Sequence, residues 1–384
     1  MKTIVTLFLS IFFSLMIYAQ SKWVQLNSGT SQQLTYLFFV NKDTGYVVGT
    51  HVILKTTNGG NSWSMNNDIG PNVNLSSVHF VNDNLGYASG AEGVIIKTTD
   101  GGDTWTYLTT NFTGTLYSVW FINADTGFAA GYWGTVIKTT NGGTTWKIMT
   151  EKEYPLLYDI RFINADTGYA VGQAGTIIRT DDAGKTWSYM ISPVNEHLNN
   201  INFHDAMNGF ISGNNGVILK TTNGGGDWLL QIPAPFQYLN AVAYASDVTA
   251  YIAASYGYIL KTENNGFFWI PEFTGFNGRI IALCFPSPDI GYAAGDQSVI
   301  FKLQPPISIE EKMSDIPGIF PNPTTGKFTI KGYSGAPQEL TILNLFGQNI
   351  HQQEYTTGSI DISTIPDGIY FMKLGKNTWK LIKQ

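Results

Sequence analysis

Short apolar runs of five to seven residues follow one another along most of the chain, separated by turns rich in Gly, Asn and Asp. One stretch shows the pattern well, with "LYSVWFI" at 116–122, "GFAAG" at 127–131, "TVIKT" at 135–139 and "TWKIM" at 145–149. Runs of this length bounded by turn residues are typical of β-strands, and helix-length apolar stripes are scarce. The pattern predicts a unit of four short strands.

This unit repeats with a period of 41 residues. A dipeptide of small residue and aromatic, such as Gly127-Phe128, starts at positions 45, 86, 127, 168, 209, 250 and 291. Tryptophans recur at 63, 105, 146, 187, 228 and 269. Four strands in about 41 residues are typical of a propeller blade, whose neighbours cover both of its faces. The sequence predicts an all-β fold with a seven-bladed β-propeller over residues 20–304.

The two ends of the array predict how the ring closes. Pro305 and Pro306 stop the seventh unit after its third strand, because proline cannot donate to a sheet. Trp23 in "SKWVQL" lies 40 residues before the first repeated tryptophan, where it is an additional copy of the fourth strand. We expect the N-terminal strand to complete the seventh blade, which removes an exposed sheet edge.

The turn before each tryptophan, "TTDGGDTW" at 98–105, resembles the Asp-box of bacterial neuraminidase-type repeats. Its Asp or Asn can accept backbone N–H bonds, its Gly can adopt a positive φ, and its Trp can pack between blades. Six near-copies around a ring cannot form one active site, and the spacing is not that of a calcium loop. A structural role is therefore predicted for Asp100, Gly102, Trp105, Asn141, Gly143, Trp146, Asp182, Gly184 and Trp187.

Together these motifs resemble the Ycf48-like group of photosystem II stability and assembly factors, over about residues 22–303. In photosynthetic members, the resemblance implies assembly of a membrane complex through an arginine-rich surface. This chain differs from those members because it is poor in arginine: its only arginines are Arg161, Arg179 and Arg279. A photosystem role is not supported.

The first 19 residues are expected to be a signal peptide. Lys2 precedes an apolar run from Ile4 to Ile17, and Ala19 is a small residue before a plausible cut. The alternative, an uncleaved anchor, is disfavoured because the run is shorter than the roughly 20 residues of a membrane span. No other segment could span a bilayer. Cys284 is the only cysteine, so it has no intrachain partner and is expected to be buried.

Residues 319–384 form a second region, a small β-sandwich after a linker at 305–318. "IFPNPTTGKFTI", "LTILNLFGQNI" and "IDISTIPDGIYFMKL" resemble the type A sorting domain of the type IX secretion system of Bacteroidota. The alternative, an ordinary β-sandwich, would not share this order of motifs. The resemblance implies that the secretion machinery is a partner and that the chain reaches the outer-membrane surface or the extracellular space. Its motif residues are Pro321, Asn322, Pro323, Gly347, Gly368 and Tyr370.

Charge and motifs exclude several classes of function. The net charge is −6 and no basic cluster interrupts the body of the chain, which argues against nucleic acid. HExxH, GxSxG and phosphate-loop motifs are missing, and the five histidines have no metal-ligand spacing, so neither metal nor cofactor is expected. A sialidase-like glycoside hydrolase needs convergent arginines, and it remains a minor alternative.

Ligand binding is the favoured function. The turns between second and third strands, and the starts of the first strands, vary between repeats and place aromatics beside Asn, Gln and Asp. Such residues suit a glycan or a peptide. The alternatives are a protein-assembly scaffold, and rings that only pack between blades. The candidate ligand-binding residues are Tyr132, Trp133, Tyr256, Trp120, Tyr158 and Asp159.

Overall fold

The computed structural model describes residues 23–304 and 318–384, except 67–68, 71–72, 151–153, 232–233, 332, 334–335, 345–346 and 376. The chain divides into two compact units, Met1–Pro306 and Ile307–Gln384. Each unit is described by itself. The expected signal peptide and most of the expected linker lie outside the described residues.

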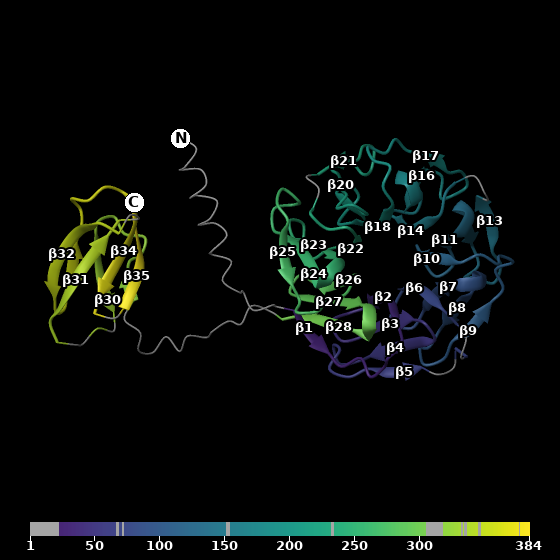
Figure 1. Cartoon of the computed structure of the whole chain (residues 1–384), viewed down its shortest axis with the longest axis horizontal. Helices are drawn as coiled ribbons and strands as arrows, with labels where there is room; N and C mark the ends of the chain where they lie inside the picture. Colours follow the sequence, from purple (N-terminus) through teal and green to yellow (C-terminus); the bar gives the residue numbers. More distant parts are fainter. Residues whose placement is uncertain are drawn as a thin grey trace. The chain divides into compact units, whose positions relative to one another are not determined.

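The first unit is a ring of seven four-stranded antiparallel sheets (Figure 1). Blade 1 contains β2 (Leu34–Phe39), β3 (Gly45–Gly49), β4 (Val52–Thr56) and β5 (Ser64–Asn66), and blade 2 contains β6 (Leu75–Phe80), β7 (Gly86–Gly90), β8 (Ile95–Thr98) and β9 (Thr106–Leu108). Blade 3 contains β10 (Leu116–Phe121), β11 (Gly127–Gly131), β12 (Val136–Thr139) and β13 (Lys147–Thr150), and blade 4 contains β14 (Leu157–Phe162), β15 (Gly168–Gly172), β16 (Ile177–Thr180) and β17 (Ser188–Tyr189). Blade 5 contains β18 (Leu198–Phe203), β19 (Gly209–Gly213), β20 (Ile218–Thr221) and β21 (Leu229–Leu230), and blade 6 contains β22 (Leu239–Tyr244), β23 (Ala250–Ala254), β24 (Tyr258–Thr262) and β25 (Ile270–Phe273).

Blade 7 joins the two ends of the array, as the sequence predicts. It contains β26 (Ile280–Ser287), β27 (Ile290–Gly295), β28 (Ile300–Leu303) and the N-terminal β1 (Trp23–Leu26). In the antiparallel pair β1–β28, Trp23 lies opposite Leu303. The Trp23 side chain is 2% exposed and meets Tyr251 and Phe285 edge to face. The closure of the ring by the N-terminal strand is confirmed.

The repeated Gly-aromatic dipeptide forms the joint between blades. The Tyr87 ring stacks on Phe121 of the next blade with centroids 3.5 Å apart, and its hydroxyl donates to the Gly142 carbonyl at 3.1 Å. Space requires a glycine before the aromatic in most blades, because a Cβ at Gly127 would lie 2.5 Å from the Phe121 ring, whereas blade 6 has Ala250 at this position. This contact recurs from blade to blade, which explains why the dipeptide keeps the 41-residue period.

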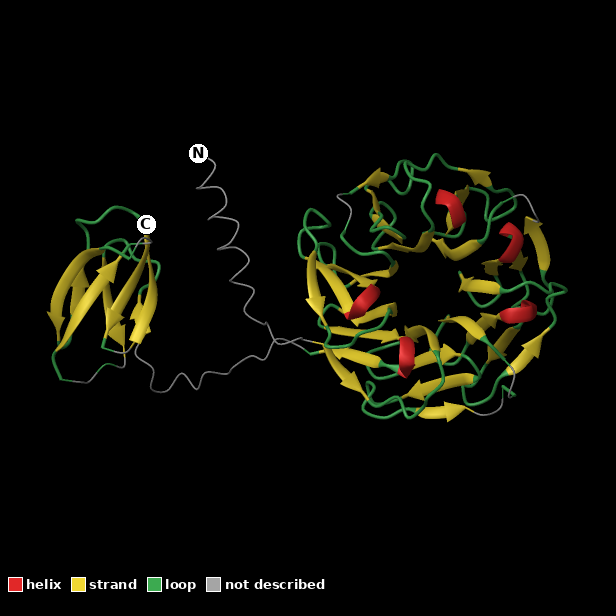
Figure 2. Cartoon of the chain, viewed as in Figure 1, coloured by secondary structure: helices red, strands yellow, loops and turns green. Residues whose placement is uncertain are grey.

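The ring has two faces, defined by their turns. On the loop face lie the turns between second and third strands and the starts of the first strands, joined for example by the bond from Tyr132 N to Thr115 O at 2.8 Å. On the opposite Asp-box face lie the Asp-box turns and the connections between first and second strands, joined by the bond from Gly142 N to Asp125 O at 2.9 Å. Short 3-10 segments, red in Figure 2, mark five of the loop-face turns: η1 (Ala91–Gly93), η2 (Tyr132–Gly134), η3 (Gln173–Gly175), η4 (Ser255–Gly257) and η5 (Asp296–Ser298).

The second unit is a β-sandwich of two sheets with the strand orders β29-β30-β33 and β32-β31-β34-β35. Phe328, Leu340, Tyr355 and Met372 are among the residues of its core. Its strands are β29 (Gly318–Phe320), β30 (Lys327–Lys331), β31 (Gln338–Leu343), β32 (Asn349–Tyr355), β33 (Ser359–Asp361), β34 (Gly368–Leu374) and β35 (Asn377–Lys383).

Candidate functional site

The loop-face turns hold their tip residues in an unusual backbone conformation. In η2, Trp133 has φ 58° and ψ 23°, the following Gly134 has φ 67°, and Thr135 N donates to Tyr132 O at 3.2 Å. Two positive φ values inside such a turn define type I′, whose first central position favours Asn or Gly. A tryptophan there is disfavoured by about 1–2 kcal/mol. The turn therefore holds a tryptophan at a position where its backbone conformation favours Asn or Gly.

Six of the blades adopt this conformation, with different residues at its first central position. In blade 1, His51 has φ 57° but is followed directly by the strand residue Val52. The residue at the tip of the turn has φ between 54° and 59° in every blade, although its identity varies. These residues are His51, Glu92, Trp133, Ala174, Asn215, Tyr256 and Gln297.

Aromatic rings lie in two neighbouring groups on the loop face, from blade 3 to the start of blade 5. Tyr132 and Trp133 are 38% and 45% exposed, with ring centroids 5.1 Å apart. Tyr117 and Tyr158, at the starts of neighbouring first strands, lie 5.7 Å from each other, and Tyr158 lies 6.2 Å from His197. We call these five residues the aromatic arc. The structure thus brings Tyr132, Trp133 and Tyr158 to one side of the ring.

A polar hollow of about 320 Å³ continues the arc over blade 5 and the start of blade 6. His197 belongs to both, and its Nδ1 accepts the backbone N–H of Ala174 at 3.2 Å. Sequence reasoning missed this hollow, because most of its residues lie in connections between blades where the repeat gives no alignment. Its lining residues are Asn195, Glu196, His197, Asn214, Asn215, Gln237 and Tyr238.

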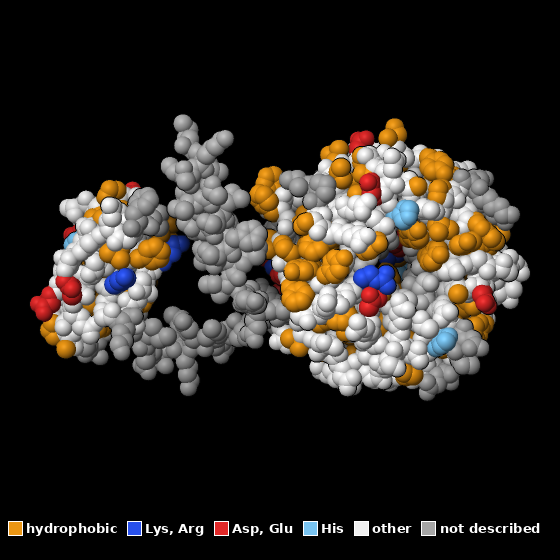
Figure 3. All heavy atoms as spheres, viewed as in Figure 1, with side chains coloured by type: hydrophobic (Ala, Val, Ile, Leu, Met, Phe, Trp, Pro, Cys, Tyr) orange, Lys and Arg blue, Asp and Glu red, His pale blue; other side chains and the backbone are white. Residues whose placement is uncertain are grey.

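Tyr256 does not belong to the arc. It is 56% exposed in η4 of blade 6, across the ring from blade 3 (Figure 1). Figure 3 shows hydrophobic side chains gathered on both sides of the central opening, over the blades of β10 to β14 and over the blade of β22 to β25. The structure therefore separates Tyr256 from Tyr132 and Trp133, although all three occupy equivalent turns.

Asp159 is not presented to a ligand, contrary to our expectation. It lies in the lumen, 2% exposed, and its carboxylate accepts bonds from Ser118 Oγ at 2.7 Å and Asn200 Nδ2 at 2.6 Å. Arg161 Nη1 lies 2.8 Å from the same carboxylate, and the backbone N–H groups of Ile160 and Ile201 donate to it as well. With both oxygens engaged, Asp159 links blades 3, 4 and 5.

Trp120 is also a residue of the lumen wall, so it offers no free stacking surface. Its ring lies between His79, with centroids 4.3 Å apart, and the Arg161 guanidinium, whose Cζ is 4.9 Å from the ring centroid. Burial lowers the pKa of His79 to about 3, so this ring is neutral, and its Nδ1 accepts the Phe121 N–H at 3.3 Å. Stacking of a ligand on Trp120 would require displacing one of these neighbours.

The Asp-boxes hold their turns through local hydrogen bonds. Asp100 Oδ1 accepts the Thr104 N–H at 2.9 Å, and the Thr98 hydroxyl accepts the Gly102 N–H at 2.8 Å. Asn141 and Asp182 accept the equivalent N–H bonds at 2.9 Å, and Gly102, Gly143 and Gly184 have φ of 82°, 87° and 73°. The tryptophans meet the aromatic joints edge to face, in the pairs Trp105–Phe80, Trp146–Phe121 and Trp187–Phe162.

The three arginines do not converge. Arg161 is in the lumen, Arg179 pairs with Asp181 at 2.7 Å, and Arg279 pairs with Asp296 at 3.0 Å on blade 7. The triad that a sialidase needs is therefore not assembled from them. Among the described residues, no group of three His, Cys, Asp or Glu side chains could hold a metal ion. Within that same part of the chain, no helix is sufficiently long and apolar for a membrane crossing.

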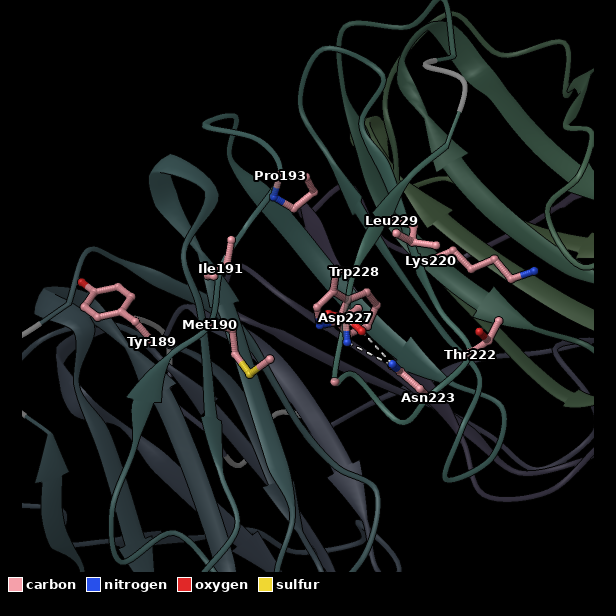
Figure 4. A pocket seen from close by; sticks show the side chains of 11 residues that line it. Tyr189, Met190, Ile191, Pro193, Lys220, Thr222, Asn223, Asp227, Trp228 and Leu229 are labelled. Atoms are coloured by element: carbon pink, nitrogen blue, oxygen red, sulfur yellow. Dashed lines mark hydrogen bonds between the residues drawn. The ribbon is translucent and has the colours of Figure 1, made fainter.

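A further hollow of about 490 Å³ lies at the outer rim between β17 and β21 (Figure 4). Met190 extends toward it from the side of blade 4, and Leu229 lines it from blade 5. Asn223 and Asp227 bond within their own Asp-box at 3.0 Å, and Lys220 donates to the Asn265 carbonyl at 2.7 Å. These polar groups are engaged elsewhere, so no set of polar groups converges on the hollow.

The motif residues of the second unit hold its last strand. Asn322 Nδ2 donates to Lys380 O at 2.7 Å, and Asn322 Oδ1 accepts the Ile382 N–H at 2.8 Å. Asn322 lies between Pro321 and Pro323, both of which follow cis peptide bonds. Gly347 has φ 77°, and the Tyr370 hydroxyl donates to Pro366 O at 2.6 Å, two residues before Gly368.

The fold and its motifs define a seven-bladed β-propeller followed by a β-sandwich of the sorting-domain type. The family model "Photosynthesis system II assembly factor YCF48" matches residues 15–153 and 148–283, and the chain belongs to this family. The model "Secretion system C-terminal sorting domain" matches residues 318–384. The chain is accordingly exported by type IX secretion to the outer-membrane surface or the extracellular space.

Solved structures share the propeller fold. A structure of YCF48 bound to D1 peptide is 18% identical, with a TM-score of 0.65, and the match covers 75% of this chain and 98% of that one. YCF48 from Cyanidioschyzon merolae is also 18% identical, with a TM-score of 0.62, covering 73% and 98%. U3-55K is 11% identical, with a TM-score of 0.64, covering 74% and 99%. No curated protein matches this chain significantly in sequence.

Proposed function

We propose that the exported propeller is a non-catalytic binding module that holds a glycan on its loop face, along the aromatic arc. The exposed pair Tyr132 and Trp133 carries the proposal, since Trp133 is displayed from a turn whose backbone disfavours it. A conformation of this kind persists only where the surrounding structure holds it. Here the repeated hairpins of the blades supply that support.

The arrangement suits a chain of sugar rings. Trp133, Tyr132, Tyr117 and Tyr158 offer successive ring surfaces, on which the apolar faces of sugars can stack. The polar hollow next to His197 adds amide groups that both donate and accept, matching sugar hydroxyls. A linear glycan lying from blade 3 to blade 5 would contact the arc first and the hollow next.

Peptide binding is the second candidate, and one observation favours it. A structural relative was solved as YCF48 bound to D1 peptide. In this chain the arc carries no Lys or Arg, and the loop-face Arg279 is already paired with Asp296 on blade 7. The uncharged surface of the arc favours a neutral glycan over a charged peptide.

The test is a glycan and polysaccharide array probed with the purified protein and two single variants, Trp133→Asn and Tyr256→Asn. Asn215 has φ 54° at the equivalent position of blade 5, so each variant keeps a conformation that the fold already accommodates. We expect the parent and Tyr256→Asn to bind the same linear glycans. Trp133→Asn is expected to bind them at least tenfold more weakly.

Two outcomes contradict the proposal. A blank array from protein with the parental melting temperature would reject glycan binding and leave peptide recognition. Glycan binding that is equally strong in Trp133→Asn would place the site away from the arc.

A further inference from the structure

A third cavity lies inside the ring, in the half of the lumen nearer the Asp-box face. It has a volume of about 300 Å³, at the small end of the range for ligand pockets. Its walls come from the second halves of the first strands, which lead into the connections of that face. The cavity is therefore separate from the aromatic arc.

The walls are strongly asymmetric. Blades 1 to 4 contribute a continuous stack of large groups, Phe38, His79, Trp120 and Arg161, with successive separations of 5.3, 4.3 and 4.9 Å. At the same level, the other three blades contribute only Asn202, Ala243 and Cys284. The cavity is the space that these small side chains leave opposite the stack.

On the loop-face side of the cavity lies a set of hydrogen-bonded side chains that we call the collar. Ser118, Asp159 and Asn200 are hydrogen-bonded across three blades, and Tyr36 accepts a hydrogen bond from Arg161 Nη2. The carboxylate of Asp159 is fully used by this collar. The guanidinium of Arg161 therefore lines the cavity, whereas the carboxylate of its partner Asp159 has no free oxygen to offer a ligand.

The cavity contains unused donors on Arg161 and His79, beside Asn202, His204 and the Tyr244 hydroxyl, which can also accept. Arg161 uses Nη1 on Asp159 and the Ile160 carbonyl, and one N–H of Nη2 on Tyr36. Its Nε–H has no partner among the described residues, and Nη2 has a second hydrogen besides the one donated to Tyr36. Because His79 accepts at Nδ1, its proton lies on Nε2, which also has no partner in that part of the chain.

We propose that this cavity binds a small carboxylate with a compact apolar body. The carboxylate takes the fork of Arg161, the geometry in which guanidinium recognises carboxylates best. Asn202, from the neighbouring blade 5, and the Nε2–H of His79, on the other side of Trp120, supply further donors in the cavity. Ala243, Cys284 and Phe285 form an apolar wall for the body of the ligand.

Other ligand classes fit less well. A cation would face the guanidinium without a free carboxylate to balance it. A compact monocarboxylate satisfies the donors and fills the small volume.

The test uses benzoate as the probe and benzamide, its neutral isostere, as the control ligand. Titration calorimetry of the purified protein should show saturable binding of benzoate and at least tenfold weaker binding of benzamide. The variant Asp159→Asn/Arg161→Gln removes both charges of the pair together, and it should reduce benzoate affinity at least tenfold. Trp133→Asn on the opposite face should leave benzoate binding unchanged.

A second variant keeps the test decisive if the double variant does not fold. Ala243→Leu fills the cavity from the wall opposite Arg161 and leaves the Arg161–Asp159 pair intact, so it should also abolish benzoate binding. Equal binding of benzoate and benzamide, benzoate binding unchanged in Ala243→Leu, or no binding to folded protein would each overturn the proposal.

Discussion

The turns on the two faces of the propeller differ in how much they vary from blade to blade. On the Asp-box face, Thr98 and Asp100 of blade 2 are matched by Thr139 and Asn141 of blade 3, with the same bonds at nearly the same distances. On the loop face, the backbone is equally constant, but Glu92 in blade 2 becomes Trp133 in blade 3. One face repeats both conformation and side chain, whereas the other repeats the conformation alone.

This difference separates side chains that hold the fold together from side chains that the fold exposes to solvent. An Asp-box side chain makes its hydrogen bonds within its own turn, so replacing it should destabilise the blade. A loop-face side chain contributes little to its own turn, so it can change from blade to blade without loss of the fold. We therefore expect effects on stability to fall from the closing strand to the lumen, then to the Asp-box, and finally to the loop face.

The largest effect is expected from the strand that closes the ring. Deleting Trp23–Leu26 removes a buried tryptophan, worth about 3–5 kcal/mol, and exposes the edge of β28. For a domain of this size, a fall in melting temperature of ~10 °C or more should follow, with aggregation. Thermal melts and gel filtration measure both. Val24→Thr, at an exposed position of the same strand, is the control, and a deletion variant that melts like the parent would contradict the closure.

Asp159→Ala tests whether Asp159 stabilises the fold, although the equivalent residue differs from blade to blade. The substitution leaves Arg161 buried without its partner, which typically costs about 3–5 kcal/mol. Asp159→Asn/Arg161→Gln removes both charges and should recover most of that loss. Chemical denaturation of the two variants measures the difference, and equal stabilities would show that the ion pair does not hold the collar.

A smaller, pH-dependent effect is expected at the Asp-boxes. Hydrogen bonds from Thr104 and Thr98 lower the pKa of Asp100 to about 2, below its ordinary value. The resulting stabilisation is present above about pH 4, the unfolded pKa, and is lost as the pH falls toward 2. Asp100→Asn keeps the turn, as Asn141 does in blade 3, without titrating. Melting temperatures from pH 7 to pH 2 should therefore fall less in Asp100→Asn than in the parent; parallel curves would contradict this assignment.

The smallest effect is expected on the loop face. Trp133→Asn and Tyr256→Asn replace exposed side chains in a conformation that Asn accepts more readily than Trp or Tyr, so the free energy of unfolding should not fall, and the relieved backbone strain should raise it by up to about 1 kcal/mol. Denaturant midpoints of the two variants measure this. A large loss in either variant would mean that its ring packs the blade instead of being displayed.

The sequence carried enough information for the architecture of the ring. A 41-residue period places four strands in each blade, and the orphan Trp23 with the break at Pro305 predicts the closing pair that β1 and β28 form. These inferences depend on local pattern and on the need to cover sheet edges. They do not require knowledge of which side chains touch.

The candidate site was less predictable, because it depends on contacts between blades. Asp159 was expected to meet a ligand, but Ser118 and Asn200, each 41 residues away, bond to it. Reading equivalent positions in successive repeats would have shown this polar column. That Trp120 is covered on both faces, and that Tyr158 joins the arc, follow from ring orientations that the sequence pattern does not specify.

The pairing of β1 with β28, which joins the two ends of the propeller, also affects the kinetics of folding and of proteolysis. Trp23 of β1 lies opposite Leu303 of β28, 280 residues further along the chain (303 − 23), so the contact that completes the ring is among the most distant in sequence. Such a contact forms late, because the entropy of closing a long loop opposes it until the intervening blades have folded. Once it has formed, proteolysis of the ring depends on how seldom β1 and β28 separate.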